Sequence, residues 1–131
     1  EMCIRDRANT SSLVTQAQSA VNIPVKIPLI SNKLDLAYFW QSWLNYHAPV
    51  EDKAFAFHYA LAQGFAELAA NQARRHQCRT IVLSGGVMHN QLLRRLLKEH
   101  LGEFHVLSAH KLPMGDGGLS LGQAVIAMHR N

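Results

Sequence analysis

The sequence predicts an α/β fold of parallel βαβα units, preceded by a helical region. In the C-terminal half, two short apolar runs alternate with two leucine- and alanine-rich stretches, and a glycine-containing turn follows each run. Strands that alternate with helices in this way favour a parallel sheet. The 131 residues are 48% hydrophobic and 17% charged, which is typical of one globular domain.

The N-terminal part shows the weakest pattern. Residues 1–22 are polar, and residues 1–7 share no pattern with the rest of the chain, so we expect 1–22 to be an unstructured or non-native leader and 23–131 to form the domain. Apolar residues alternate over 23–30, but Pro24 and Pro28 interrupt the alternation. This predicts an edge strand or extended segment, followed by a turn at 31–33.

Two amphipathic helices are expected next. Residues 34–46 carry an apolar stripe that we expect to be core: Leu36, Phe39, Trp40, Trp43 and Leu44. The longest helix should span about 50–76, with one apolar face made of Phe57, Leu61, Phe65 and Leu68, and with alanines that allow close packing. His58 lies beside that face and is interpreted as a hydrogen-bonded, partly buried histidine, not as a ligand or base.

The remaining elements alternate more clearly. The expected order is strand 80–83, helix 88–101, strand 104–108 and helix 117–129. In a βαβ unit both strands point the same way, so the loops after Leu83 and Ser108 should emerge at one edge of the sheet. Ligands of open α/β sheets bind at that edge, and neighbouring strands lie ~5 Å apart, so both loops could touch one ligand.

Charge and composition exclude several classes of function. The 13 Lys and Arg exceed the 9 Asp and Glu, but they are scattered, so we expect no nucleic-acid partner. The densest group, Arg94, Arg95 and Lys98, is interpreted as a solvated helix surface, with steering of anions as the alternative. Cys3 and Cys78 are too few and too far apart for a disulfide framework or zinc knuckle, and we expect Cys78 to be a small packing residue.

No apolar stretch approaches the ~20 residues that span a bilayer, and the start lacks the apolar segment of a signal peptide. We therefore expect a cytoplasmic protein with no membrane partner.

The turn that contains Gly85 and Gly86 is the first candidate site. Two missing Cβ atoms at a strand-to-helix junction let backbone N–H groups approach a phosphate, although a tight turn without a ligand uses glycine in the same way. Asn90 is expected in the first turn of the following helix, where its amide can both donate to and accept from a ligand's hydroxyl groups. The alternative for Asn90 is a local capping contact.

Asp116 is the second candidate. It precedes two glycines and an apolar helix, which suits an N-cap. An aspartate at the carboxyl edge of a sheet, opposite a phosphate loop, can instead bind a divalent metal. Its position in the sequence does not decide between these roles.

Two stretches, residues 79–93 and 112–124, resemble the C-terminal part of the HypF family of hydrogenase-maturation carbamoyltransferases. Phe57 and His58 also fit the family pattern. The resemblance implies an actin-like (Kae1-like) ATPase domain, of which this chain would be the C-terminal half. That fold is shared with the enzymes that transfer threonylcarbamoyl groups to tRNA.

Members of this family use carbamoyl phosphate and ATP to make a carbamoyl-adenylate. They then transfer the carbamoyl group to the C-terminal cysteine of a HypE-type partner, where it becomes the source of the cyanide ligands of nickel–iron hydrogenase. The resemblance implies that Gly85 and Gly86 lie against the nucleotide phosphates and that Asn90 contacts the nucleoside. It also implies that Asp116 completes a divalent metal site, with iron or zinc.

The chain also departs from the family. Nothing in residues 1–49 resembles the motif that carries the two metal-binding histidines, and the other domains of the family are missing. We therefore expect a fragment that is inactive alone, with no catalytic residue of its own. A related alternative is a tRNA threonylcarbamoyltransferase, but its later motif usually has Asn where this chain has Gly117. A third interpretation is a non-catalytic nucleotide-binding or packing module.

Overall fold

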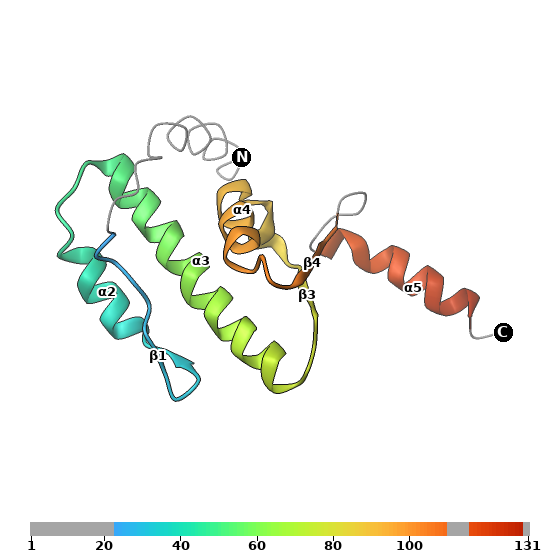
Figure 1. The fold of residues 1–131 in the computed structure, drawn as a ribbon. Helices are drawn as coiled ribbons and strands as arrows, with labels where there is room; N and C mark the ends of the chain where they lie inside the picture. Colours follow the sequence, from blue (N-terminus) through green and yellow to red (C-terminus); the bar gives the residue numbers. More distant parts are fainter. Residues whose placement is uncertain (1–22, 110–115, 130–131) are drawn as a thin grey trace.

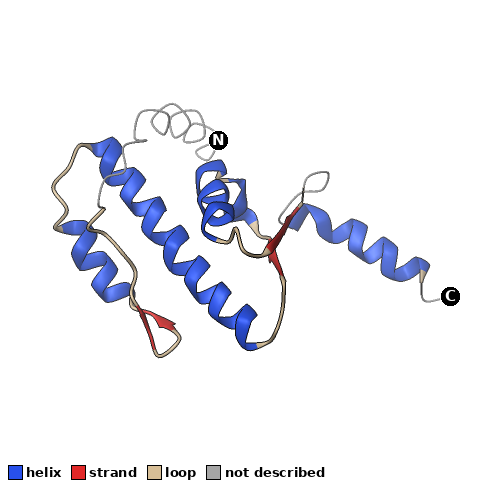
Figure 2. Cartoon of the chain, in the orientation of Figure 1, coloured by secondary structure: helices blue, strands red, loops and turns tan. Residues whose placement is uncertain are grey.

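The computed structural model describes residues 23–109 and 116–129 and has an α/β architecture. The long helix α3 (Val50–Arg75) separates two groups of elements, with α2 and a hairpin on one side and α4 with a pair of strands on the other (Figure 1). The strands form two separate two-stranded sheets, and helix dominates the described chain (Figure 2). The remaining elements are β1 (Leu29–Ile30), β2 (Lys33–Leu34), α2 (Leu36–Leu44), β3 (Thr80–Leu83), η1 (Gly86–His89), α4 (Gln91–His100), β4 (His105–Ser108), η2 (Asp116–Gly118) and α5 (Leu119–Met128).

The segment before β1 is extended but is not a strand. Its alternation buries Val25 and Ile27 against α3, as an edge strand would, but Pro24 and Pro28 have no N–H to donate to a ladder. Only Leu29–Ile30 pairs, antiparallel to β2. The predicted strand over 23–30 is therefore correct only at its end, while the extended conformation is confirmed.

Helix α2 is shorter than predicted, and its apolar stripe is only partly buried. Asp35 caps the helix by accepting a hydrogen bond from the backbone N–H of Tyr38 at 3.0 Å. Phe39 is fully buried, and the indole N–H of Trp43 donates to the Lys53 carbonyl at 3.0 Å. Trp40, however, is 47% exposed.

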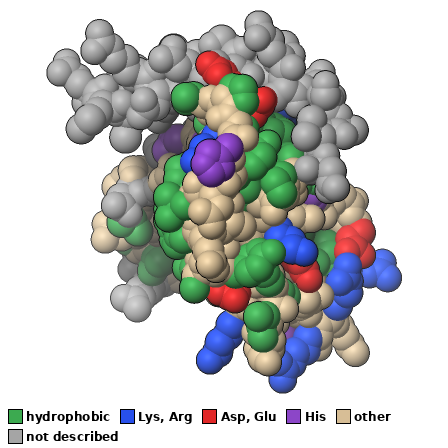
Figure 3. All heavy atoms as spheres, turned by 90° about the vertical axis from the view of Figure 1, so that its left-hand side faces the viewer, with side chains coloured by type: hydrophobic (Ala, Val, Ile, Leu, Met, Phe, Trp, Pro, Cys, Tyr) green, Lys and Arg blue, Asp and Glu red, His purple; other side chains and the backbone are tan. Residues whose placement is uncertain are grey.

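The prediction that the whole stripe of α2 is core was therefore wrong for three residues, Leu36, Trp40 and Leu44, which are exposed. The reason is that α3 covers only one side of this helix (Figure 1). Seen from the α2 side, the surface shows hydrophobic side chains across its middle, with most Lys and Arg side chains toward the lower right and Asp and Glu side chains both at the top and in the lower half (Figure 3).

Helix α3 agrees with its predicted bounds to within one residue, but small residues form its buried surface. The expected core residue Phe65 is 49% exposed, so the predicted large apolar face was wrong there. The buried positions of α3 are Ala56, Ala60, Ala62, Gly64, Ala66, Ala70 and Ala73. Because α3 packs against neighbours on two sides, short side chains let those neighbours approach its backbone closely.

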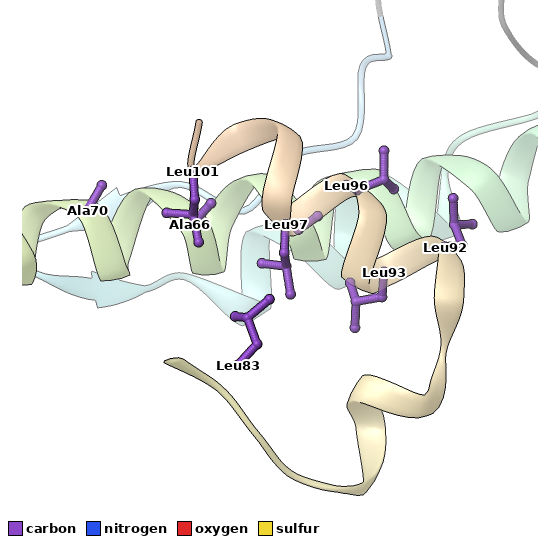
Figure 4. Close-up of a cluster of buried hydrophobic side chains, with 9 residues drawn as sticks. Ala66, Ala70, Leu83, Leu92, Leu93, Leu96, Leu97 and Leu101 are labelled. Atoms are coloured by element: carbon purple, nitrogen blue, oxygen red, sulfur yellow. The ribbon is translucent and has the colours of Figure 1, made fainter. Parts of the chain in front are cut away.

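The βαβ prediction is confirmed by the second sheet. β3 and β4 are parallel, with Thr80 opposite His105 and Leu83 opposite Ser108, so the two strands end at the same edge. Helix α4 connects them and packs its leucines against the alanines of α3 and against Leu83 (Figure 4). The labelled core residues are Ala66, Ala70, Leu83, Leu92, Leu93, Leu96, Leu97 and Leu101.

Helix α5 has no comparable packing. Each of its residues is exposed, including the apolar Leu119, Val125 and Ile126, and the helix extends away from the rest of the molecule (Figure 1). Cys78 is exposed as well, with its thiol 3.6 Å from the His76 carbonyl, so its predicted packing role was wrong. In the described part of the chain, no helix combines the length and apolar character that a bilayer crossing requires.

Candidate functional site

The first glycine turn follows β3 and has an unusual backbone. Gly85 has φ 101° and ψ 161°, a conformation that is essentially restricted to glycine. Gly86 begins the short 3-10 helix η1, and a Cβ built on Gly86 would meet no described atom within 4 Å. Close packing among the described residues therefore does not require a glycine at position 86. The missing side chain leaves open space over the turn.

Asn90 ends this turn and caps the next helix. Its Oδ1 accepts a hydrogen bond from the backbone N–H of Leu93 at 3.0 Å, and its own N–H donates to the Val87 carbonyl at 3.0 Å. α4 begins at Gln91, so the expectation that Asn90 lies in the first helical turn was wrong by one position. The capping contact, which the sequence left as an alternative, is present.

His58 of α3 reaches the same asparagine. Its Nε2 lies 2.9 Å from Asn90 Nδ2, and its Nδ1 lies 2.8 Å from the Ala54 carbonyl. The interpretation of His58 as a hydrogen-bonded, partly buried histidine is thus confirmed, but its link to the candidate site was missed. No spacing rule connects residues 32 apart, since only the packing of α3 on α4 brings them together.

The second glycine turn is only partly described. Asp116 begins the 3-10 helix η2, but its side chain lies outside the part of the chain that the structure describes, so its metal role stays a prediction. The N-cap of α5 is Gly118, which has no side chain with which to cap the helix. The N-cap alternative assumed that Asp116 directly precedes the helix, but Gly117 and Gly118 lie between Asp116 and the start of α5.

The described residues do not form a metal site by themselves. Within 23–109 and 116–129 there is no group of three or more His, Cys, Asp or Glu residues that could hold an ion. A carboxylate at Asp116 would need nitrogen or oxygen ligands from elsewhere.

Other polar features lie outside the two glycine turns, one of them at the end of β4. The Ser108 hydroxyl, at the end of β4, is buried and has no hydrogen-bond partner among the described residues. On α4, Arg95 is exposed and pairs with Glu99 at 3.6 Å. Arg94 and Lys98 are half-buried, so the expected solvated surface is seen only at Arg95. Arg74 of α3 pairs with Glu103 and is also exposed.

Comparison with known proteins identifies the family of this fold. The family model described as "Carbamoyltransferase, Kae1-like Domain, second subdomain" matches residues 8–123, which include both glycine turns. The chain belongs to the HypF carbamoyltransferase family. The family resemblance predicted from the two motifs is confirmed, together with the Kae1-like fold.

Curated HypF relatives agree with this assignment. Carbamoyltransferase HypF of Rhodobacter capsulatus is 32% identical over 101 residues, which cover 77% of this chain and 14% of that protein. The probable HypF of Methanocaldococcus jannaschii is 31% identical over 114 residues, or 85% of this chain and 15% of the relative. A HypF homologue of Cupriavidus necator is 36% identical over 76 residues, or 56% of this chain and 19% of the relative.

A solved structure shows the same fold. The crystal structure of T. kodakarensis HypF superposes with a TM-score of 0.74 at 25% sequence identity, covering 90% of this chain and 16% of that one. The chain thus spans 14–19% of the length of the HypF proteins that it matches.

Proposed function

We propose that this chain forms one wall of the nucleotide site of a HypF carbamoyltransferase. That enzyme would use carbamoyl phosphate and ATP to form a carbamoyl-adenylate and then carbamoylate the C-terminal cysteine of a HypE-type partner. The proposal rests on family membership and on one structural observation, the open glycine turn at the carboxyl edge of a parallel sheet. That edge is where ligands bind in open α/β sheets.

The turn suits a phosphate group for two reasons. Gly85 adopts a backbone conformation that residues with a Cβ rarely reach, and Gly86 leaves room for a ligand to approach the backbone N–H groups. Asn90 stands at the end of the same turn, where a nucleoside would lie if the phosphates sat over the glycines. Asp116 would supply one oxygen ligand to a divalent iron or zinc, with the histidine ligands coming from outside the described residues.

The test is ATP binding to the full-length carbamoyltransferase that contains this chain, measured by calorimetry. Gly86→Val fills the space over the turn, and Asn90→Ala removes the amide. We expect each to weaken ATP binding at least about tenfold, since each removes close contacts to a charged ligand. Asn71→Ala is the matched control, because it makes the same change at an exposed position of α3.

Carbamoyl-phosphate-dependent ATP turnover provides a second readout. If the double variant Asn90→Ala, Asp116→Ala retained normal turnover, these residues would not belong to the site. If Gly86→Val also left ATP affinity unchanged, the turn would have only a structural role. The chain would then be a packing module within the carbamoyltransferase.

A further inference from the structure

The hydrogen bonds around Asn90 fix the orientation of its amide group. The backbone N–H of Leu93 can only donate, so the atom 3.0 Å from it must be the Asn90 oxygen. The amide nitrogen of Asn90 therefore faces His58, 2.9 Å from Nε2. A flipped amide would place two donors against each other at the helix cap.

The protonation of His58 is fixed in the same way. The Ala54 carbonyl can only accept, so His58 Nδ1, 2.8 Å away, carries the hydrogen. His58 Nε2 must then be the unprotonated acceptor of a neutral imidazole, because it faces the amide hydrogen of Asn90. Both ring nitrogens are thus used, one by the backbone of α3 and one by the residue that caps α4.

We propose that His58 is a positioning residue for Asn90 in the nucleotide site, an inference that rests on the proposed function. Asn90 Nδ2 has two hydrogens. His58 accepts one, and the other is left to donate to an acceptor atom of a nucleotide, such as a ribose oxygen or a ring nitrogen. Since Leu93 holds the amide oxygen, both ends of the amide are anchored before the ligand arrives.

The support for this arrangement comes from the core. The ring of His58 lies edge-on to that of Phe57, with the centroids 5.7 Å apart, and the neighbouring Ala56 and Ala60 are buried. On the other side, Leu92 and Leu93 of α4 are buried in the cluster that includes the alanines of α3. Helix packing thus sets the separation of His58 and Asn90.

Two amide substitutions at position 58 test the inference in the full-length carbamoyltransferase. His58→Gln places an amide oxygen near the position of Nε2, so it can still accept from Asn90. His58→Asn is one carbon shorter and cannot reach. We expect ATP affinity, measured by calorimetry, to remain within about twofold of wild type for Gln and to fall about tenfold for Asn, the effect of one hydrogen bond.

The readouts separate positioning from general stability and from the proposed function. A thermal melt of each variant checks the fold, and the Gln and Asn variants should melt within a few degrees of each other. Once Asn90→Ala is present, His58→Asn should cause no further loss of ATP affinity. Independent, additive losses would overturn the positioning role, and so would equal ATP affinity of the Gln and Asn variants. If Asn90→Ala alone left ATP binding unchanged, the proposed function itself would fail.

Discussion

The two glycine turns of this chain have very different supports. The first, from Ser84 to Asn90, lies between β3 and α4, and the leucines of α4 are buried against the alanines of α3. The second, η2, leads into α5, whose residues are all exposed. The contrast indicates that packing among the described residues supports the first turn, whereas the described residues give α5 no such support.

The exposed residues of α5 suggest where that surface belongs. Leu119, Val125, Ile126 and Met128 are between 46% and 76% exposed, which is unusual for so many apolar residues on one short helix. HypF proteins are several times longer than this chain, and we expect other parts of their fold to cover α5.

The largest expected effect comes from the core beneath the first turn. Leu97→Ala should lower the free energy of unfolding by about 2–5 kcal/mol, because Leu97 is buried against α3 and its removal leaves a cavity. Leu119→Ala is the matched control on α5, where the side chain is 63% exposed. In urea unfolding of the 131-residue chain, this control should lose less than about 0.5 kcal/mol of unfolding free energy. Equal losses would contradict the contrast between the two supports.

A glycine pair gives the next largest difference. A Cβ at Gly64 would lie 2.9 Å from Ile27 Cβ, so Gly64→Ala should destabilise the chain by about 1–3 kcal/mol through overpacking. A Cβ at Gly122 of α5 would meet nothing within 4 Å, so Gly122→Ala should stabilise the chain by up to about 1 kcal/mol through helix propensity. Opposite signs in denaturant unfolding are expected. If Gly122→Ala also lowered the free energy of unfolding, α5 would be packed in the isolated chain.

A smaller effect is expected at the cap of α4. Asn90→Ala should cost about 1 kcal/mol of unfolding free energy, because the N–H of Leu93 loses its side-chain acceptor. Asn90→Ser keeps a capping oxygen but cannot reach His58, so it should recover most of that stability without restoring ATP affinity. Recovery of both would show that the cap alone matters for the ligand.

The smallest effect is expected on the outer face of α4. Arg95→Ala should change unfolding free energy by less than about 0.5 kcal/mol, since its pairing with Glu99 at 3.6 Å is exposed. ATP affinity should also stay the same if Arg95 belongs to the solvated surface. A marked loss of ATP affinity would instead favour the alternative that the basic group of α4 steers anions.

Local sequence patterns were enough to predict the elements that frame the site. The strand Thr80–Leu83 and the parallel pairing with His105–Ser108 follow from short apolar runs that alternate with helices. The length of α3 follows from an uninterrupted helical stretch after Pro49. Both signals depend on neighbouring residues, which a single sequence contains.

Other features depend on contacts between distant residues. The exposure of Phe65 and Trp40 depends on which sides of α3 and α2 are covered, and periodicity does not specify that. The bond between His58 and Asn90 depends on how α3 and α4 pack. Asn90 was predicted as a site residue from its place after the glycines, yet it caps α4 because the helix starts at Gln91, three residues later than the predicted start at residue 88.

The most direct test is amide hydrogen exchange at the first glycine turn in the full-length carbamoyltransferase, with and without ATP. If the backbone N–H groups of Gly85, Gly86 and Val87 bind the nucleotide phosphates, their exchange should slow when ATP is added, while exchange at the exposed outer face of α4 around Arg95 should stay unchanged. Unchanged exchange at the turn under conditions where calorimetry shows bound ATP would contradict the proposed nucleotide site.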